Sequence, residues 1–451
     1  MGYSEIYCHI CGVSFNINRF RTIKEPRSAT LGDDPDELTL EECAERETCY
    51  FIYRHPYDPQ PTVDIGPEFA ASSSKKFLES IQSIEPDVDG GAWEHFPGPD
   101  CANETAYNGY NISVEAMRGC NVVQCLVRKS DDWQPEPDGE PFEISGTLFL
   151  SGLSGSMPSR DMSSPEVFPG RHGEMSPAAE NCMWDAEPLQ EYAMPFHPTC
   201  FEIFKRASIR RYGAVDVGCL MQWWKLEPSY DDFQNFPRDP AVEMAQEQWW
   251  QHNQGDEYLV ANPCFVPGLE AILSSTQYLQ EVDNNNSRLT PTAILTKTTP
   301  MDPFSRLPAE IRLSILSLLD FQDVANLRLT SRVFLQLPKS LFHQLTISNT
   351  PWLYEAWSSL PLSFWATTSP AELERNHEPP RMPRPTTSVT LLDVAKTDWF
   401  HLQTEISRNW QKLPGLQNRR RIWKDCEEIL DRVDSYRKLG KIEPRSTVDV
   451  K

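Results

Sequence analysis

Two pairs of potential metal ligands lie far apart in the sequence, and their types and spacing indicate one chemistry. Cys8 and Cys11 form a C-x-x-C pair followed by Gly12, a spacing that lets two thiolates face one ion across a tight turn. His197 and Cys200 are three residues apart at a predicted helix start, so both side chains can point at one centre from its first turn. Together the two pairs would complete a tetrahedral Cys₃His zinc site.

Other ligand sets remain open for this site. A knuckle could use His9, Cys43 or Cys49 in place of the distant pair, or the chain could bind no metal at all. His95 and Cys101 lie in an aromatic, Pro-rich loop and could also be drawn into metal binding. A lone histidine in such a loop, however, is more often packed and hydrogen-bonded than bound to an ion.

A catalytic role for the same residues is the alternative from another functional class. Cys200 would be the nucleophile and His197 its base, but no Gly-rich, serine or acid-pair motif supports such chemistry. A redox role for the C-x-x-C pair is disfavoured because no βαβ pattern follows it. Four protein ligands leave no open coordination position, so we expect the zinc to be structural and the chain to be non-catalytic.

For the two pairs to meet, residues 12–192 must fold between them. The alternation of apolar residues predicts strands over 122–127 and 142–150, within a region rich in loops. Residues 1–280 are therefore predicted to form one acidic α+β domain, irregular, zinc-stapled and with few short strands. Residues 281–302 are polar, rich in Asn, Thr and Pro, and predict a linker.

Two further groups of residues could be functional or structural. The pairs Trp223-Trp224 and Trp249-Trp250 could line a pocket, but we expect them to be anchors of the core. The run Arg419-Arg420-Arg421 is expected on the solvated face at the start of a helix, not as a nucleic-acid patch.

Composition narrows the class of protein. The chain has 451 residues, 39% of them apolar, and a net charge of −23. In the first 300 residues acidic side chains outnumber basic ones by 26, a field that repels phosphate backbones and disfavours nucleic-acid binding. No apolar run approaches the ~20 residues of a membrane span, and no signal pattern opens the chain. We therefore expect a cytoplasmic or nuclear protein, not a secreted one, whose 12 cysteines stay reduced.

Residues 303–345 have the most regular pattern in the chain. Pro308 falls at a helix start, and Asp320 is placed to cap a second helix, with Asp323 in its first turn. The first helix has one apolar stripe of about three turns, formed by Ile311, Ile315, Leu318 and Leu319. The sequence therefore predicts two or three short helices that are too small to be stable alone.

This order of residues resembles an F-box. The resemblance implies docking on a Skp-type adaptor and, through it, on a cullin–RING ubiquitin ligase. It implies adaptor contacts by, or support of them from, Leu307, Pro308, Glu310, Ile311, Ile315, Leu318, Leu319, Val324 and Leu327. The whole arrangement also resembles filamentous-fungal F-box proteins with an N-terminal C-x-x-C domain.

The rest of the chain bears on which part would select a target protein. Residues 346–451 are predicted to be a helical region with a Pro-rich loop over 366–388. No internal repeat of about 20–50 residues is present, so the acidic domain over 1–280 is the candidate for target recognition. The target itself is not readable from the sequence. The alternative is a zinc-stapled protein-interaction module that acts outside ubiquitylation, with the hairpin over 303–345 serving internal packing.

Overall fold

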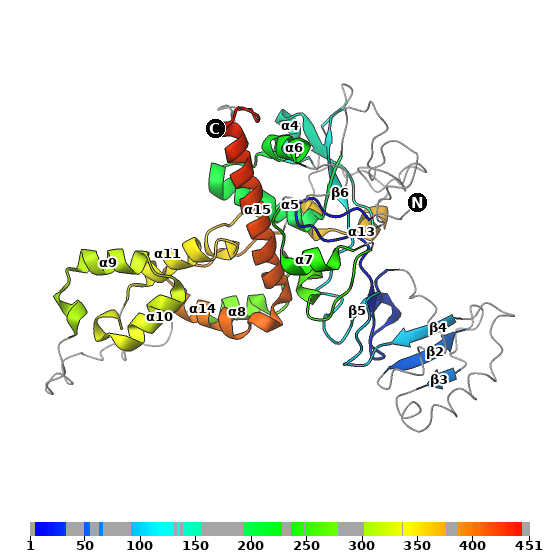
Figure 1. Cartoon of the computed structure of the whole chain (residues 1–451), viewed down its shortest axis with the longest axis horizontal. Coiled ribbons are helices and arrows are strands. Elements are labelled where there is room, and N and C mark those ends of the chain that lie inside the picture. Colours follow the sequence, from blue (N-terminus) through cyan, green and yellow to red (C-terminus); the bar gives the residue numbers. More distant parts are fainter. Residues whose placement is uncertain are drawn as a thin grey trace. The chain divides into compact units, whose positions relative to one another are not determined.

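A computed structural model describes twelve stretches of the chain, which form two compact units (Figure 1). The described stretches are 5–32, 49–54, 63–65, 92–129, 133–135, 139–155, 193–227, 236–247, 249–277, 302–335, 337–375 and 387–443. Unit 1 comprises Met1–Pro267, Ser363–Thr386 and Pro414–Lys451, and unit 2 comprises Gly268–Leu362 and Thr387–Leu413. Besides loops, the described residues form helices and a few short strands, which confirms the expected mixture of α and β structure. None of the described helices has the length and apolarity of a membrane span.

The strands of unit 1 form three small sheets. One sheet pairs β1 (Arg19–Phe20) with β5 (Tyr107–Asn108). The second has the spatial order β3 (Val63–Ile65), β2 (Tyr50–Arg54), β4 (Ala92–Phe96). The third has the order β7 (Leu148–Leu150), β6 (Gln124–Arg128), β8 (Met194–Phe196). The first pair is parallel and the two triplets are antiparallel. In the last sheet, Leu126 pairs with Leu150 on one side and Met194 on the other, and all three are buried. Sheets this small need helices packed against them to be stable.

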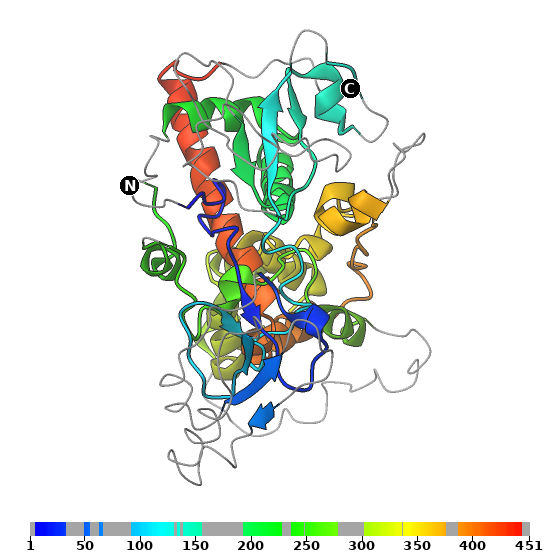
Figure 2. The ribbon, with the colours of Figure 1, turned by 90° about the vertical axis from the view of Figure 1, so that its right-hand side faces the viewer.

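Two helices from distant parts of the sequence organise unit 1. α15 (Pro414–Lys438) packs along α5 (Pro198–Tyr212), and it is the long red helix in Figures 1 and 2. The close approach at the start of α15 requires a glycine, because a Cβ on Gly415 would lie 2.4 Å from the Asn262 carbonyl oxygen. The other helical elements of this unit are η1 (Arg27–Ala29), α4 (Pro141–Ser145), α6 (Val217–Leu226), α7 (Pro240–Ala245), η2 (Glu257–Val260), α12 (Phe364–Thr367) and α13 (Pro370–Arg375).

Unit 2 is helical throughout its described residues. Its elements are α8 (Leu269–Ser275), η4 (Pro303–Arg306), α9 (Ala309–Ser317), α10 (Phe321–Thr330), η5 (Arg332–Phe334), α11 (Lys339–Asn349), η6 (Tyr354–Ala356), α14 (Trp399–Arg408) and η7 (Trp410–Lys412). It contains an aromatic cluster: the rings of Phe321, Phe342 and Phe400 contact one another with centroids 5.3–6.2 Å apart. The Arg328 guanidinium lies 4.1 Å from the centre of the Phe400 ring. These contacts join α10, α11 and α14 into one core.

The units divide the chain differently from the expected domains. The helical region expected over 346–451 is split, because α12, α13 and α15 belong to unit 1 while α14 belongs to unit 2. Likewise α8 belongs to unit 2, although it falls within the domain expected over 1–280. The physical reason is that α15 packs on α5 and α6, contacts between segments that a sequence pattern does not reveal. The loop expected over 366–388 contains α13, and its residues 376–386, like the linker residues 281–301, lie outside the described residues.

Candidate functional site

The Cys8–Cys11 knuckle is a tight turn closed by its own backbone. The Cys8 N–H donates to the Val13 carbonyl at 2.9 Å, and the Gly12 N–H donates to the Cys8 carbonyl at 2.7 Å. Gly12 has φ = 76°, a left-handed conformation that glycine adopts without steric cost. The turn therefore brings both thiols to the same side, as the C-x-x-C spacing predicts.

The second pair lies where β8 passes into α5. His197 is the N-cap residue of α5, and Pro198 occupies the first helical position, where its missing N–H costs nothing. Cys200 follows in the first turn, with its N–H donating to the His197 carbonyl at 2.9 Å. The helix start thus fixes the imidazole and the third thiol relative to each other.

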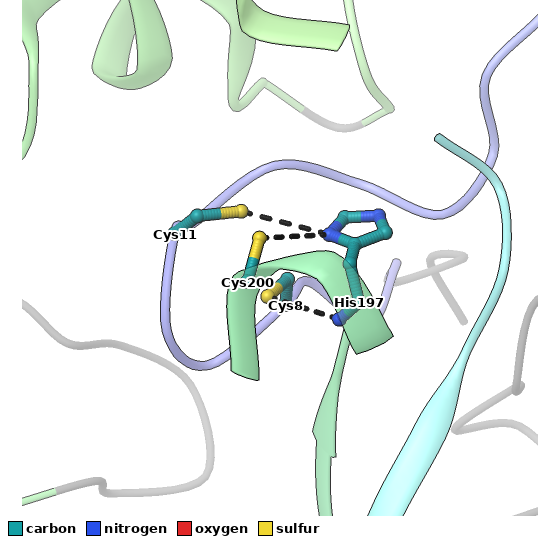
Figure 3. A group of neighbouring side chains, drawn as sticks. All are labelled: Cys8, Cys11, His197 and Cys200. Carbon is teal, nitrogen blue, oxygen red and sulfur yellow. Dashed lines mark hydrogen bonds between the residues drawn. The ribbon is translucent and has the colours of Figure 1, made fainter. Parts of the chain in front are cut away.

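The structure brings all four side chains together (Figure 3). Their ligand atoms lie within 4.8 Å of one another, and each residue is buried. The His197 Nδ1 atom is 3.6 Å from the Cys11 sulfur and 3.8 Å from the Cys200 sulfur. In a tetrahedral zinc site with standard bond lengths, a sulfur and a nitrogen ligand are about 3.6 Å apart. The cluster therefore has the composition and the size of a Cys₃His centre before any ion is added.

The pKa values of Cys11, His197 and Cys200 are each shifted by burial and by neighbours within this cluster. Burial opposes ionisation of Cys11, but hydrogen bonds with Cys200, Cys8 and His197 outweigh it and hold the Cys11 pKa well below its usual range. Burial raises the pKa of the Cys200 thiol, and Cys11 and Cys8 raise it further. Burial lowers the pKa of His197, but the charge on Cys8 and the contact with Cys11 raise it to about 10. A bound dication would displace the protons that His197 and Cys200 hold at neutral pH.

Buried guanidinium groups surround the knuckle, which the sequence did not suggest. Arg421 donates to the Cys11 carbonyl at 2.7 Å, and Arg238 donates to the His9 carbonyl at 3.3 Å. Both also pair with Asp425, at 3.3 and 3.4 Å. Zinc with three thiolates and a neutral imidazole carries one net negative charge, which buried cations offset.

The expected position of the arginine run is therefore wrong for two of its three members. Arg419 and Arg421 are buried, and only Arg420 is exposed. The reason is that each buried guanidinium finds backbone acceptors: Arg419 donates to the Pro263 carbonyl at 2.6 Å, as Arg421 does to that of Cys11. Buried charged groups persist when they are hydrogen-bonded in this way.

The alternative ligands fall elsewhere. His9 is turned to Trp224, whose indole N–H donates to His9 Nδ1 at 2.7 Å. Cys43 lies outside the described residues. Cys49 belongs to a separate group with His95 and Cys101, which the sequence placed only among side possibilities.

Burial also bears on the catalytic alternative. A nucleophilic thiolate needs a lowered pKa and access to substrate, whereas Cys200 is buried with a raised pKa.

Three of the four paired tryptophans are buried in unit 1, as expected for core anchors: Trp223, Trp224 and Trp250. Trp249 is exposed, so its expected place in the core is wrong.

In unit 2, the first two helices of the segment over 302–349 begin where the sequence predicts. Pro308 is the N-cap residue of α9, and Asp320 caps α10 by accepting from the Asp323 N–H at 2.7 Å. Asp302 links the start of η4 to the end of α10, because its carboxylate accepts from the Ser331 hydroxyl at 2.6 Å. Hydrogen bonds at the helix ends therefore help to fix where these helices begin and end.

The apolar stripe of α9 is not sealed inside the protein. Leu318 is 86% exposed and Ile311 48%, while Leu316, outside the stripe, is the α9 side chain that is buried at 1%. The residues expected at the adaptor surface divide into exposed Pro308, Glu310, Ile311 and Leu318, partly buried Leu307, Ile315, Leu319 and Leu327, and buried Val324. In this conformation Val324 can support such a surface from below but cannot touch a partner.

Residues 304–348 match the F-box-like family. The chain therefore carries an F-box-like domain. The match covers α9, α10 and most of α11, and exposed apolar side chains lie on or next to the first two of these helices. Three exposed leucines of the F-box-like domain were not among the predicted adaptor contacts: Leu313, Leu329 and Leu335. They lie off the periodic stripe, so only the structure identifies them as exposed.

Comparison with curated proteins finds a short similarity. A 45-residue segment is 49% identical to the mitochondrial ATP-dependent RNA helicase mss116 of Aspergillus oryzae, which is 10% of this chain and 7% of that protein. The chain thus matches a small part of the length of that relative, and the similarity does not extend to the rest of either protein. No solved structure matches the chain.

Proposed function

We propose that this protein is a non-catalytic substrate receptor of a cullin–RING ubiquitin ligase. Its F-box-like domain docks on a Skp-type adaptor, and unit 1 holds the target protein. The observation that carries the proposal is the combination of the F-box-like match over 304–348 with apolar side chains left exposed on those same helices. The receptor lowers no chemical barrier itself; it brings a target close to a ubiquitin-charged enzyme.

The adaptor contact rests on the exposed apolar residues around α9. Covering a fully exposed leucine side chain contributes about 1.5–3 kcal/mol, and a few such anchors usually dominate an interface. Among the predicted contact residues, Leu318 and Ile311 are therefore the strongest anchors, and Pro308 lies at the start of the helix. Glu310 in the first turn adds a charge at the rim, where it affects orientation more than affinity.

The Cys8, Cys11, His197 and Cys200 cluster is proposed to hold a structural zinc ion. Three thiolates and one imidazole suit zinc, and four protein ligands leave no position for a reacting water. The ion would join the knuckle to the start of α5, two segments whose ligands are 186 residues apart in the chain. In this proposal the zinc stabilises the target-binding unit and takes no part in ubiquitin transfer.

Co-purification with the adaptor tests the proposal. The full chain and a Skp-type adaptor are co-expressed, and the variants Leu318→Asp and Ile311→Asp are compared with wild type. Both are expected to lose the adaptor while keeping a wild-type circular dichroism spectrum, because the changed side chains are already exposed. Leu439→Asp is the matched control, since Leu439 is 69% exposed but lies in unit 1.

Two outcomes would count against the proposal. If wild type does not retain the adaptor, unit 1 would have to act as an interaction module outside ubiquitylation. If the Leu318 and Ile311 variants retain the adaptor as well as Leu439→Asp does, the docking face has been assigned to the wrong residues.

A further inference from the structure

A second group of metal-ligand side chains lies in unit 1 and shares no residue with the first. Cys49 immediately precedes β2, His95 lies in β4, and Cys101 follows a turn after that strand. The antiparallel pairing of β2 with β4 sets Phe51 opposite His95, which brings Cys49 to the same end of the sheet. All three side chains are buried.

The distances within this group are those of a coordination shell. The two sulfurs and the imidazole nitrogen lie within 4.8 Å of one another, and the Cys101 sulfur is 3.8 Å from His95 Nε2. A sulfur and a nitrogen bound to one zinc ion are about 3.6 Å apart. Packing alone does not require two thiols and an imidazole nitrogen to converge on one point.

The backbone around the group is fixed as in a metal-binding turn. The Gly98 N–H donates to the Cys49 sulfur, and the Cys101 N–H donates to the Gly98 carbonyl at 3.1 Å. The Asn108 side chain holds the same turn from outside, donating to the carbonyls of Gly98 at 2.7 Å and Cys101 at 3.1 Å. A buried amide with two acceptors on one four-residue turn preorganises the position of the Cys101 thiol.

We propose that Cys49, His95 and Cys101 bind a second zinc ion through two thiolates and His95 Nε2. Thiolate and imidazole donors favour zinc over magnesium or calcium, which prefer oxygen. Among the described residues no further Cys, His, Asp or Glu joins the group, so the fourth ligand is a water or comes from outside these residues. Through these three ligands the ion would tie the start of β2 to the turn after β4.

The sheet that this ion would hold is otherwise marginal. It has three strands of 5, 3 and 5 residues, and short sheets are stable only with further support. Among the described residues, β1 and the residue after it support this sheet. The centre of the Phe20 ring lies 5.1 Å from that of the His95 ring, and Arg21 forms an ion pair with Glu94 at 2.7 Å. A metal bond at the end of the sheet closes the long connection between residues 49 and 101.

Zinc stoichiometry of the purified full chain tests the proposal. Wild type is expected to contain two zinc ions per chain by mass spectrometry of metals, and Cys49→Ser and His95→Gln one each. Cys11→Ser, in the first centre, is also expected to contain one, and the double variant Cys11→Ser/Cys49→Ser none. Cys264→Ser is the matched control with two, because Cys264 belongs to neither group.

A measurement on wild type keeps the test valid if a variant fails to fold. The chain loaded with ¹¹³Cd is expected to give two resonances, the second shifted as for a ligand set with fewer sulfurs. One resonance, or one zinc that disappears in Cys11→Ser, overturns the proposal. So does a Cys49–Cys101 disulfide in peptide mapping without reductant. Adaptor binding is measured in parallel and is expected to survive Cys49→Ser, so failure here is separate from failure of the receptor function.

Discussion

The Cys₃His cluster of unit 1 and the F-box-like domain of unit 2 are built on opposite principles. The cluster gathers buried polar groups from residues 186 apart, each of which is costly to bury without a partner. The F-box-like domain is a continuous segment of 45 residues that leaves leucines such as Leu318 exposed. The first region satisfies its unusual residues from within, whereas the second leaves them exposed.

This difference assigns the two regions different kinds of dependence. Unit 1 is expected to depend on what is bound inside it, namely metal and buried hydrogen bonds. The F-box-like domain is expected to depend on its own apolar core and helix caps for folding, and on a partner only for function. The experiments that follow separate these dependences.

Metal removal is expected to have the largest effect and to act on unit 1 alone. Structural zinc contributes roughly 10 kcal/mol of folding free energy in small domains, which is comparable to the whole stability of an ordinary domain. A strong chelator is expected to abolish hydrogen-exchange protection in β8 and α5, next to the cluster, and to leave protection in α10 and α11 unchanged. Unchanged exchange in α5, or equal loss in α10, would remove the distinction between the two units.

A buried and an exposed leucine of the F-box-like domain sharpen the comparison within unit 2. Leu316 is 1% exposed, so Leu316→Ala is expected to lower the free energy of unfolding by about 2–5 kcal/mol. Leu318→Ala is expected to change it by less than about 0.5 kcal/mol. Denaturant unfolding measures both, and adaptor affinity should rank them in the reverse order. If both variants lose stability equally, Leu318 has a folding role and its exposure does not signal docking.

A buried histidine gives unit 1 a dependence on pH between about pH 7.5 and pH 5. The His252 Nδ1–H donates to the Glu104 carbonyl at 2.9 Å, and its Nε2 accepts from the Asn18 N–H at 3.1 Å. Burial lowers the pKa of His252 to about 4. Below its ordinary pKa of about 6.5, the unfolded chain gains a proton that the folded chain does not, so stability falls as the pH falls.

The size of this effect follows from the two pKa values. Between about pH 7.5 and pH 5, wild type is expected to lose about 2 kcal/mol of stability through His252. His252→Gln retains hydrogen-bonding capacity without the titration and should lose less over the same range. Urea unfolding of both proteins at the two pH values gives the difference. Parallel losses in wild type and variant would show that His252 does not control the pH response.

What the sequence could predict follows the same division. The helix starts at Pro308 and Asp320 were predictable, because caps and periodicity are local signals. The pairing of Cys8 and Cys11 with His197 and Cys200 was proposed from ligand chemistry, and the structure brings the four together. Ligand types constrain a long-range contact even when spacing does not.

The failures concern features decided by tertiary contacts. Residues 142–150 were predicted as one strand, but Pro141–Ser145 form α4 and only Leu148–Leu150 join the sheet. Glu143 decides this, because its buried carboxylate accepts from the backbone N–H groups of Glu140 and Leu150 and so fixes a helical turn. The Cys49, His95 and Cys101 group has no motif spacing, and only strand pairing brings it together.

The smallest expected effect tests how local the stability of the F-box-like domain is. Asp320 accepts the Asp323 N–H at 2.7 Å and satisfies one of the donors that the start of α10 leaves unpaired. Asp320→Ala is expected to cost about 1 kcal/mol, and Asp320→Asn only a small part of that, since asparagine also caps helices. Hydrogen exchange in the first turn of α10 measures the local change, with Gln322→Ala as an exposed control in the same turn. Because the cap acts on its own helix, adaptor affinity should fall only as far as α10 frays. A larger loss of affinity than of local stability would mean that Asp320 itself contacts the partner, and the line between self-sufficient fold and docking surface would have to be redrawn there.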